Sequence, residues 1–270
     1  MNKMVRRNKI RNICVFLIIG MISVSLNGCG AGKAKDKSVT VFAAASLTEC
    51  FTEVGKELKK DKNIDAVFNF AGSQALVTSI EQGSKADVFA SANTKYMDKL
   101  KESDTVSESV IFAENNIVLC KNKNSKVTVD KFEDLSKPGV KIIAGDKSVP
   151  VGNYFYKALD NQLSEKSINQ DTYTNIVSNI KSNELDVKSV VSKVALGEGD
   201  IGIVYRTDVN ENNKQDLDII ELKEFENLNV QYPIATINKC NNSKEAKEFI
   251  DYLTGAKGKE ILTKHGFKVD

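Results

Sequence analysis

The chain has 270 residues, of which 41% are hydrophobic and 27% are charged, with no tryptophan, three prolines and one histidine. This balance is typical of a folded globular protein and excludes a chain that is disordered throughout. The length is sufficient for two lobes of ordinary domain size. The formal net charge is +2.

Residues 1–28 have the pattern of a secretory signal peptide. Five basic residues precede an apolar stretch at 13–26, which is short for a membrane span. The stretch ends in LNGC at 26–29, which resembles a bacterial lipobox, a signal that is cleaved before its cysteine. We therefore expect Cys29 to carry a lipid that anchors the exported protein to the outer face of the cell membrane. An ordinary cleaved signal and an uncleaved anchor are the alternatives.

Loss of the signal peptide would reverse the net charge. It removes five basic residues and no acidic ones, which leaves 33 basic against 36 acidic residues and a net charge of −3. This balance excludes a general basic surface for nucleic acid. A site for an anion would have to work within a mildly negative protein.

Three cysteines remain after the signal peptide and the lipidated residue. Cys50, Cys120 and Cys240 are an odd number and have no C-x-x-C or histidine spacing, which argues against a metal site or a disulfide framework. Buried or idle thiols are the simplest expectation. Because Cys120 and Cys240 both end expected strands, a disulfide between them stays open as an alternative.

The rest of the chain alternates strands and helices after a small, polar tether at 29–37. The expected strands are 39–44, 66–71, 87–91, 116–120, 141–144, 201–205, 217–222 and 229–237. The expected helices are 47–60, 74–82, 96–102, 152–163 and 187–196, followed by helices from 243. Apolar strands separated by helices predict parallel sheets buried on both faces, in an α/β protein of two lobes.

Four segments share one local plan, in which a small residue or a turn leads into the start of a helix. They are 44–47, 71–74, 149–152 and 186–188. The first turn of a helix has unpaired N–H donors and a partial positive charge, so it can hold an anion without a cationic side chain. Capping alone is the alternative: Ser46 with Glu49 fits a capping box, and Ser73 and Asp186 fit plain N-caps.

Motifs along nearly the whole mature chain resemble those of the molybdate-binding proteins of ABC transporters. They are VFAAASLTE at 41–49, FAGSQAL at 70–76, ADVFASAN at 86–93, GDKSVPVGNYFYKAL at 145–159, DVKSVVSKVALGEGDIGIVYRTD at 186–208, YPIATI at 232–237 and HGF at 265–267. The resemblance implies a two-lobed periplasmic-binding-protein-like fold of type II, with a ligand cleft between lobes joined by two crossover strands. It also implies delivery of molybdate or tungstate to an ABC permease, by a monomer without a cofactor.

The same resemblance implies which residues hold the oxyanion. Ser46 and Ser73 match serines that donate from one lobe. Val151 and Val187 match positions that donate backbone amides from the other lobe, and Tyr205 matches a tyrosine whose hydroxyl reaches the ligand. By itself Tyr205 would read as a half-buried aromatic residue at the end of a strand. No charged side chain and no ligand to a metal cation is among these residues.

Val151 departs from the family pattern, which usually has alanine in this turn. The amide donor is kept, but two added methyl groups could narrow the pocket and alter the preference between molybdate and tungstate.

The resemblance also implies a division of the chain. We expect one lobe from 38–117 and 233–270 and the other from 118–232, with Asn116–Cys120 and Gln231–Ile237 as the crossovers. Closure of the lobes would bring both sets of donors onto the anion.

Two functions are alternatives to the binding of molybdate or tungstate. The first keeps the fold and takes sulfate, phosphate or another tetrahedral anion. The second is a secreted enzyme, which the sequence disfavours because His265 is the single histidine and no triad, metal-ligand cluster or carboxylate pair is visible.

Overall fold

The computed structural model describes residues 37–269, all within one compact unit. The expected signal peptide, the lipidation site at Cys29 and the tether up to residue 36 lie outside the described residues. No described helix is both long enough and apolar enough to cross a membrane.

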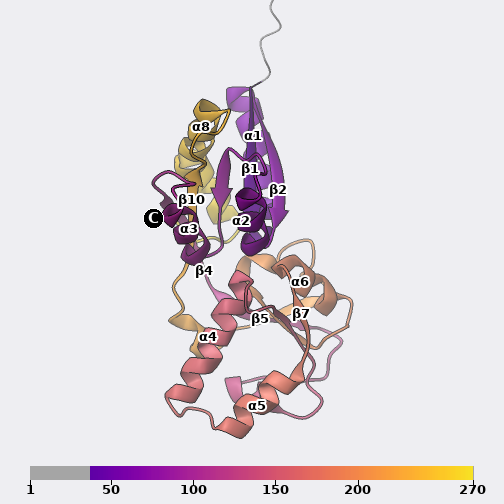
Figure 1. Ribbon diagram of the computed structural model, residues 1–270. Coiled ribbons are helices and arrows are strands. Elements are labelled where there is room, and N and C mark those ends of the chain that lie inside the picture. The colour runs from indigo at the N-terminus through magenta and orange to yellow at the C-terminus, as the bar shows by residue number, and fades with distance from the viewer. Residues whose placement is uncertain (1–36, 270) are drawn as a thin grey trace, which may run out of the picture. The chain divides into compact units, whose positions relative to one another are not determined.

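Two five-stranded sheets organise the described chain (Figure 1). The first sheet has the order β2 (Ile64–Ala71), β1 (Lys37–Ala44), β3 (Val88–Ala90), β10 (Val230–Thr236) and β4 (Val110–Asn115). The second has the order β7 (Ile180–Glu184), β6 (Ile142–Gly145), β8 (Ile201–Tyr205), β5 (Ile117–Asn122) and β9 (Leu217–Ile220). The expected two-lobed α/β fold is confirmed.

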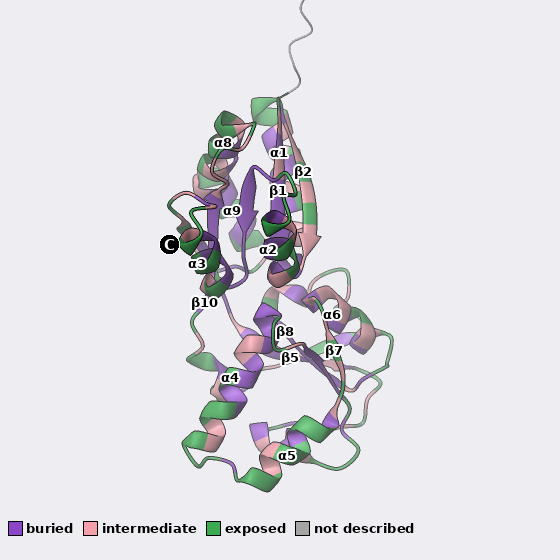
Figure 2. Ribbon diagram, in the orientation of Figure 1, coloured by how far each residue is buried: buried purple, intermediate pink, exposed green. Residues whose placement is uncertain are grey.

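Helices are divided between the two sheets. The first lobe has α1 (Thr48–Lys62), α2 (Ser73–Glu81), α3 (Thr94–Glu102), α8 (Ser243–Thr254), α9 (Ala256–Lys264) and the 3-10 helix η1 (Ala45–Leu47). The second lobe has α4 (Pro150–Ser164), α5 (Gln170–Asn179), α6 (Val187–Ala195), α7 (Lys223–Glu226) and the 3-10 helices η2 (Phe132–Ser136) and η3 (Arg206–Asp208). Figure 2 shows the central strands mostly buried and the helices exposed on their outer sides, as amphipathic layers require.

The expectation of parallel sheets is correct for only part of each sheet. Strands β1, β2 and β3 are parallel, as are β6, β7 and β8. However, β10 is antiparallel to both of its neighbours, and so is β5. These two strands begin where the chain passes from one sheet into the other, and each enters its new sheet in the opposite direction.

The strand pairing locates the two crossings between the sheets. Asn116 alone separates β4 from β5, so Ile117 belongs to the second sheet, where it pairs with Tyr205. The expected boundary at 232/233 falls inside β10, because Val230 and Gln231 already pair with β4 of the first sheet. The strand pairing therefore assigns 117 to the second sheet and 230–232 to the first.

The lobe cores are built from large buried side chains. Phe51 of α1 packs against Phe112 and Phe249 with ring centroids 5.7 and 5.6 Å apart in the first lobe. In the second lobe Phe132 meets Phe225 edge to face at 5.8 Å. Apolar burial of this kind is the main stabilising contribution in both lobes, and it fixes the strand ends from which the functional loops extend.

The three described cysteines are free thiols. Cys120 is buried in β5 and Cys240 is half-buried after β10, so the disulfide left open by the sequence does not form. Burial raises the pKa of Cys50 and of Cys120 to about 12 in each case, which makes both thiols unreactive.

Candidate functional site

One small cavity is lined by all five residues that the sequence analysis selected. Its enclosed volume is only about 10 Å³. The lining consists of Ala44, Ala45, Ser46, Ala71, Gly72, Ser73, Ala92, Val149, Pro150, Val151, Val187 and Tyr205. Residues of both lobes contribute, so the cavity lies where the two lobes meet.

Strand register brings the first-lobe segments together. Strands β1 and β2 are parallel, and Ala44 lies opposite Ala71 at the end of both. The chain leaves each strand at the same edge of the sheet, and Ser46 and Ser73 follow within two residues. This is the carboxyl edge at which α/β sheets bind ligands.

Ser46 is directed by a chain of hydroxyl and amide groups. It is 4% exposed, and its Oγ lies 3.1 Å from the hydroxyl of Tyr232. The side-chain amide of Asn115 donates to the Tyr232 hydroxyl at 3.4 Å. Either hydroxyl of this pair can be the donor, and donation by Tyr232 would leave the Ser46 proton for the cavity.

The capping-box alternative for Ser46 is wrong. Neither η1 nor α1 has a side-chain cap, because their N-cap residues are Ala44 and Leu47, and the Ser46 hydroxyl contacts Tyr232 instead. Glu49 is likewise engaged elsewhere, in an ion pair with Lys188.

Ser73 has a similar arrangement. It is fully buried as the first residue of α2, and its Oγ accepts a hydrogen bond of 3.2 Å from the backbone amide of Ala92. Gly72, not Ser73, is the N-cap residue, so the plain N-cap interpretation is wrong here too. With the oxygen accepting from Ala92, the hydroxyl proton of Ser73 remains free for donation.

Two helices of the second lobe begin at the cavity. Pro150 is the first residue of α4, and Val151 follows it with an N–H that has no acceptor within the helix. Val187 is the first residue of α6. Both helices therefore direct free amides and the positive end of the helix dipole towards the cavity.

Asp186 caps α6, as the sequence analysis preferred. Its Oδ1 accepts from the amide of Ser189 at 2.9 Å, and its Oδ2 accepts from the Ser189 hydroxyl at 3.0 Å. The carboxylate is occupied by the third residue of the helix, which leaves the first-turn amide of Val187 unpaired.

The Val151 side chain packs into its own lobe. It is fully buried, and a Cβ at Gly145 would lie only 2.9 Å from Val151 Cγ1. The glycine at the end of β6 thus makes room for one of the two methyl groups that distinguish valine from the usual alanine. The added volume is directed at least in part towards β6.

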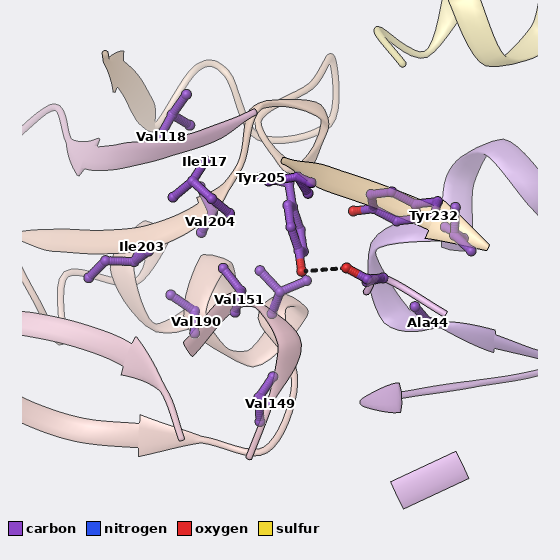
Figure 3. Packing of buried hydrophobic residues seen from close by; sticks show 14 of the residues in the cluster. Ala44, Ile117, Val118, Val149, Val151, Val190, Ile203, Val204, Tyr205 and Tyr232 are labelled. Carbon is purple, nitrogen blue, oxygen red and sulfur yellow. Dashed lines mark hydrogen bonds between the residues drawn. The ribbon is translucent and has the colours of Figure 1, made fainter. Parts of the chain in front are cut away.

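Tyr205 spans the cavity from the end of β8. It is the last residue of β8, as the alternative interpretation had it, but it is 1% exposed and not half-buried. Its hydroxyl lies 3.5 Å from the carbonyl oxygen of Ala92 in the first lobe, at the outer limit for a hydrogen bond (Figure 3). Its ring is tilted against that of Tyr232 with centroids 5.6 Å apart.

Both tyrosines keep their protons. Burial raises the pKa of Tyr205 and that of Tyr232 well above the ordinary value, so both hydroxyls are neutral donors at physiological pH. No lining residue carries a charge. The lining therefore offers neutral hydroxyl and amide donors, together with the backbone carbonyl of Ala92.

In residues 37–269 no group of histidine, cysteine, aspartate and glutamate side chains is arranged to hold a metal ion. His265 ends α9 and lies 2.9 Å from Glu53, far along the chain from the cavity-lining segments.

Two residues of the site were not assigned a functional role from the sequence. Ala92 contributes a carbonyl and an amide to the cavity wall, and Tyr232 orients the Ser46 hydroxyl. Both lie within motifs that carried the family resemblance. Their contacts join distant parts of the chain, which residue spacing could not indicate.

Comparison with known proteins decides the family. The model of the family described as "Bacterial extracellular solute-binding protein" matches residues 39–268. This chain belongs to that family. It is a solute-binding protein and not an enzyme.

Individual relatives narrow the relationship. The molybdate-binding protein ModA of Mycobacterium bovis is 30% identical over 94% of this chain and 95% of its own length. YvgL of Bacillus subtilis, which carries the designation of an ABC transporter substrate-binding lipoprotein, is 29% identical over 96% of each chain. By sequence the chain is thus a member of the ModA group.

A solved structure agrees with this fold. The periplasmic molybdate-binding protein of Azotobacter vinelandii superposes with a TM-score of 0.71 at 17% identity, covering 86% of this chain and 99% of that protein. At this identity the likeness concerns the fold of the solute-binding protein alone.

Proposed function

We propose that this protein captures molybdate or tungstate outside the cell and delivers it to an ABC importer. The observation that carries the proposal is the cavity lined by neutral donors from both lobes. Ser46 and Ser73 donate through hydroxyls, Val151 and Val187 through amides, and Tyr205 through its phenol. The relatives named ModA support molybdate as the ligand.

Neutral donors suit a fully ionised anion. Molybdate and tungstate have no proton at neutral pH, so each of their oxygens accepts hydrogen bonds. Phosphate keeps a proton, for which the cavity lining offers no carboxylate. A buried group left without its partner costs about 1–3 kcal/mol, so several mismatches separate anions by orders of magnitude.

We expect size, and not charge, to disfavour sulfate. It has the same charge as molybdate but shorter bonds to oxygen, so its oxygens would sit farther from some of the donors. Hydrogen bonds weaken with distance, and a rigid set of donors cannot follow a smaller anion inwards. The dimensions of the cavity are therefore the proposed basis of selectivity.

Contacts between the lobes support capture by closure. The side-chain amide of Gln74 donates to the carbonyl of Leu185 at 2.7 Å, and the hydroxyl of Tyr96 donates to the carbonyl of Ser148. A Cβ at Gly72 would lie 2.4 Å from the same Leu185 oxygen, so only glycine allows this approach. We infer that these contacts form as the lobes close on the anion.

The proposal includes export and a lipid anchor on Cys29. The pattern of residues 1–29 and the lipoprotein designation of YvgL support it. A lipid on Cys29 would hold the protein beside its membrane permease. Mass spectrometry of the N-terminal peptide from cells tests this step, since an unmodified cysteine or an uncleaved signal would contradict it.

A thermal-shift panel tests the ligand. A ligand that binds only the folded state stabilises it by RT ln(1 + [L]/Kd). Molybdate and tungstate should raise the melting temperature of the mature domain, whereas sulfate, phosphate and vanadate at equal concentration should raise it less. If molybdate and tungstate produce no shift, the proposed function is wrong.

A further inference from the structure

An ionic network lies just outside the cavity and joins the two lobes. The ammonium of Lys188, on α6 of the second lobe, is 2.8 Å from Glu49 Oε2, on α1 of the first lobe. The same ammonium is 3.2 Å from Asp208 Oδ1, at the end of η3 in the second lobe. Lys188 therefore bridges a carboxylate of its own lobe and one of the opposite lobe.

Each member of the network is close in sequence to a proposed binding residue. Lys188 directly follows Val187. Glu49 lies one helical turn after Ser46. Asp208 accepts a hydrogen bond of 3.1 Å from the backbone amide of Tyr205. Movement of any of the three binding segments would thus disturb the network.

Burial strengthens the electrostatic interactions within this network. The side chain of Asp208 is fully buried, and those of Lys188 and Glu49 are 25% and 30% exposed. Burial alone would lower the pKa of Lys188, but Asp208 and Glu49 outweigh it and raise that pKa, so the ammonium stays charged. Lys188 thereby neutralises carboxylates that would otherwise repel a dianion in the cavity beside them.

Another lysine on the same helix has a different environment. Lys193 lies 2.7 Å from Glu184, which belongs to β7 of the same lobe. Its ion pair does not depend on the position of the first lobe. The two lysines of α6 therefore form a matched pair for comparison.

We propose that Lys188 is a positioning residue for anion capture, because its pair with Glu49 can form only when the lobes are closed. The pair stabilises the closed, ligand-bound state and slows release of the anion. In the open state Lys188 keeps Asp208 as its partner, and Glu49 is left in solvent. The inference rests on the proposed function, since it requires an anion in the cavity.

Rates of anion binding and release test this role. Molybdate, or whichever anion of the panel binds, is measured by stopped flow with the wild type, Lys188→Met, Glu49→Gln, the double variant and Lys193→Met. We expect Glu49→Gln to raise the dissociation rate about tenfold, with a much smaller change in the association rate. Lys193→Met should behave like the wild type.

The double variant distinguishes loss of the Lys188–Glu49 ion pair from loss of the Lys188 charge alone. Lys188→Met leaves both Glu49 and Asp208 without their cation, so it should release the anion faster than Glu49→Gln does. Adding Glu49→Gln to it removes one of the two repelling carboxylates. The double variant should therefore release the anion more slowly than Lys188→Met alone.

Glu49→Gln decides the outcome, because it keeps the buried Asp208 paired and should fold even if Lys188→Met does not. An unchanged dissociation rate in Glu49→Gln would mean that Lys188 only neutralises Asp208 and does not stabilise the closed state. The inference would then be overturned. If the wild type binds molybdate or tungstate, that result leaves the proposed function intact. If the wild type binds no anion at all, both proposals are wrong.

Discussion

Ser46 and Ser73 have hydroxyl oxygens that already contact a neighbour. Ser46 contacts the hydroxyl of Tyr232, and Ser73 accepts from the amide of Ala92. Each oxygen is then held in place before the anion arrives, and the Ser73 proton is directed away from the Ala92 amide. A preorganised donor loses little entropy on binding, which favours tight capture.

Removal of either hydroxyl should weaken binding. We expect Ser46→Ala and Ser73→Ala each to weaken molybdate affinity by about 10- to 100-fold, the effect of losing one hydrogen bond to a charged ligand. Isothermal titration calorimetry of the mature domain measures this. Ser79→Ala is the matched control, because Ser79 lies on α2 with its hydroxyl bonded to the Ala75 carbonyl. Wild-type affinity in both cavity variants would contradict the assignment.

Val151 is the residue at which selectivity should be adjustable. Val151→Ala keeps the amide and removes two methyl groups, so the cavity becomes wider. A wider cavity should hold sulfate less well relative to molybdate, and competition titrations would show this. Because Val151 is fully buried, the variant should also lose about 2 kcal/mol of unfolding free energy. An unchanged ratio of the two affinities would show that the valine side chain does not shape the cavity.

Among the helices, α6 has a first turn that is capped by Asp186 and that also supplies a proposed amide donor to the anion. Asp186→Ala removes the side chain that accepts from Ser189, which should cost about 1 kcal/mol of stability and loosen the first turn. Molybdate affinity should fall with it, because the Val187 amide belongs to that turn. Asp186→Asn can still cap α6, so this variant should keep most of the stability and most of the molybdate affinity.

Urea denaturation and calorimetry of these two variants check the prediction. If Asp186→Ala loses stability but binds molybdate as the wild type does, the start of α6 is not part of the site.

Strong apolar periodicity explains which elements the sequence predicted. Strands β6 and β8 lie inside their sheet and are fully buried, and β1 is buried from Val41 to Ala44, so these residues form continuous apolar runs. Strand β7 and helix α5, which the sequence did not predict, lack that signal. Strand β7 is an edge strand with alternating exposure, and α5 buries only Ile176 and Asn179. Their pattern depends on neighbours that are remote in sequence.

The site was predictable where it coincided with local motifs. Helix starts after β1, β2 and β6, together with the family resemblance, led to the five residues that line the cavity. The support of Ser46 by Tyr232 and Asn115 was not predictable, because it crosses 186 positions of sequence. Antiparallel pairing of β5 and β10 was missed because direction is set by the crossings between lobes, which apolar runs do not reveal.

At the scale of the whole molecule, capture requires that the lobes close. The chain passes between the sheets at Asn116 and again in the segment between β9 and β10. Few residues therefore need to change conformation for the lobes to separate. Small-angle X-ray scattering should show a smaller radius of gyration for the mature domain with molybdate than without it.

Closure and affinity should change together. Because Gly72 approaches the Leu185 carbonyl closely, Gly72→Val should hinder closure and reduce both the scattering change and the affinity. A radius of gyration that does not respond to molybdate in the wild type would contradict capture by closure.

The most direct test of the account is a calorimetric titration of the purified mature domain with molybdate, in the presence and absence of excess sulfate. The cavity lined by neutral donors predicts one molybdate per chain, bound tightly, with little competition from sulfate. Absence of binding heat in several buffers and at several temperatures, or displacement of molybdate by sulfate at similar concentration, would contradict the central claim.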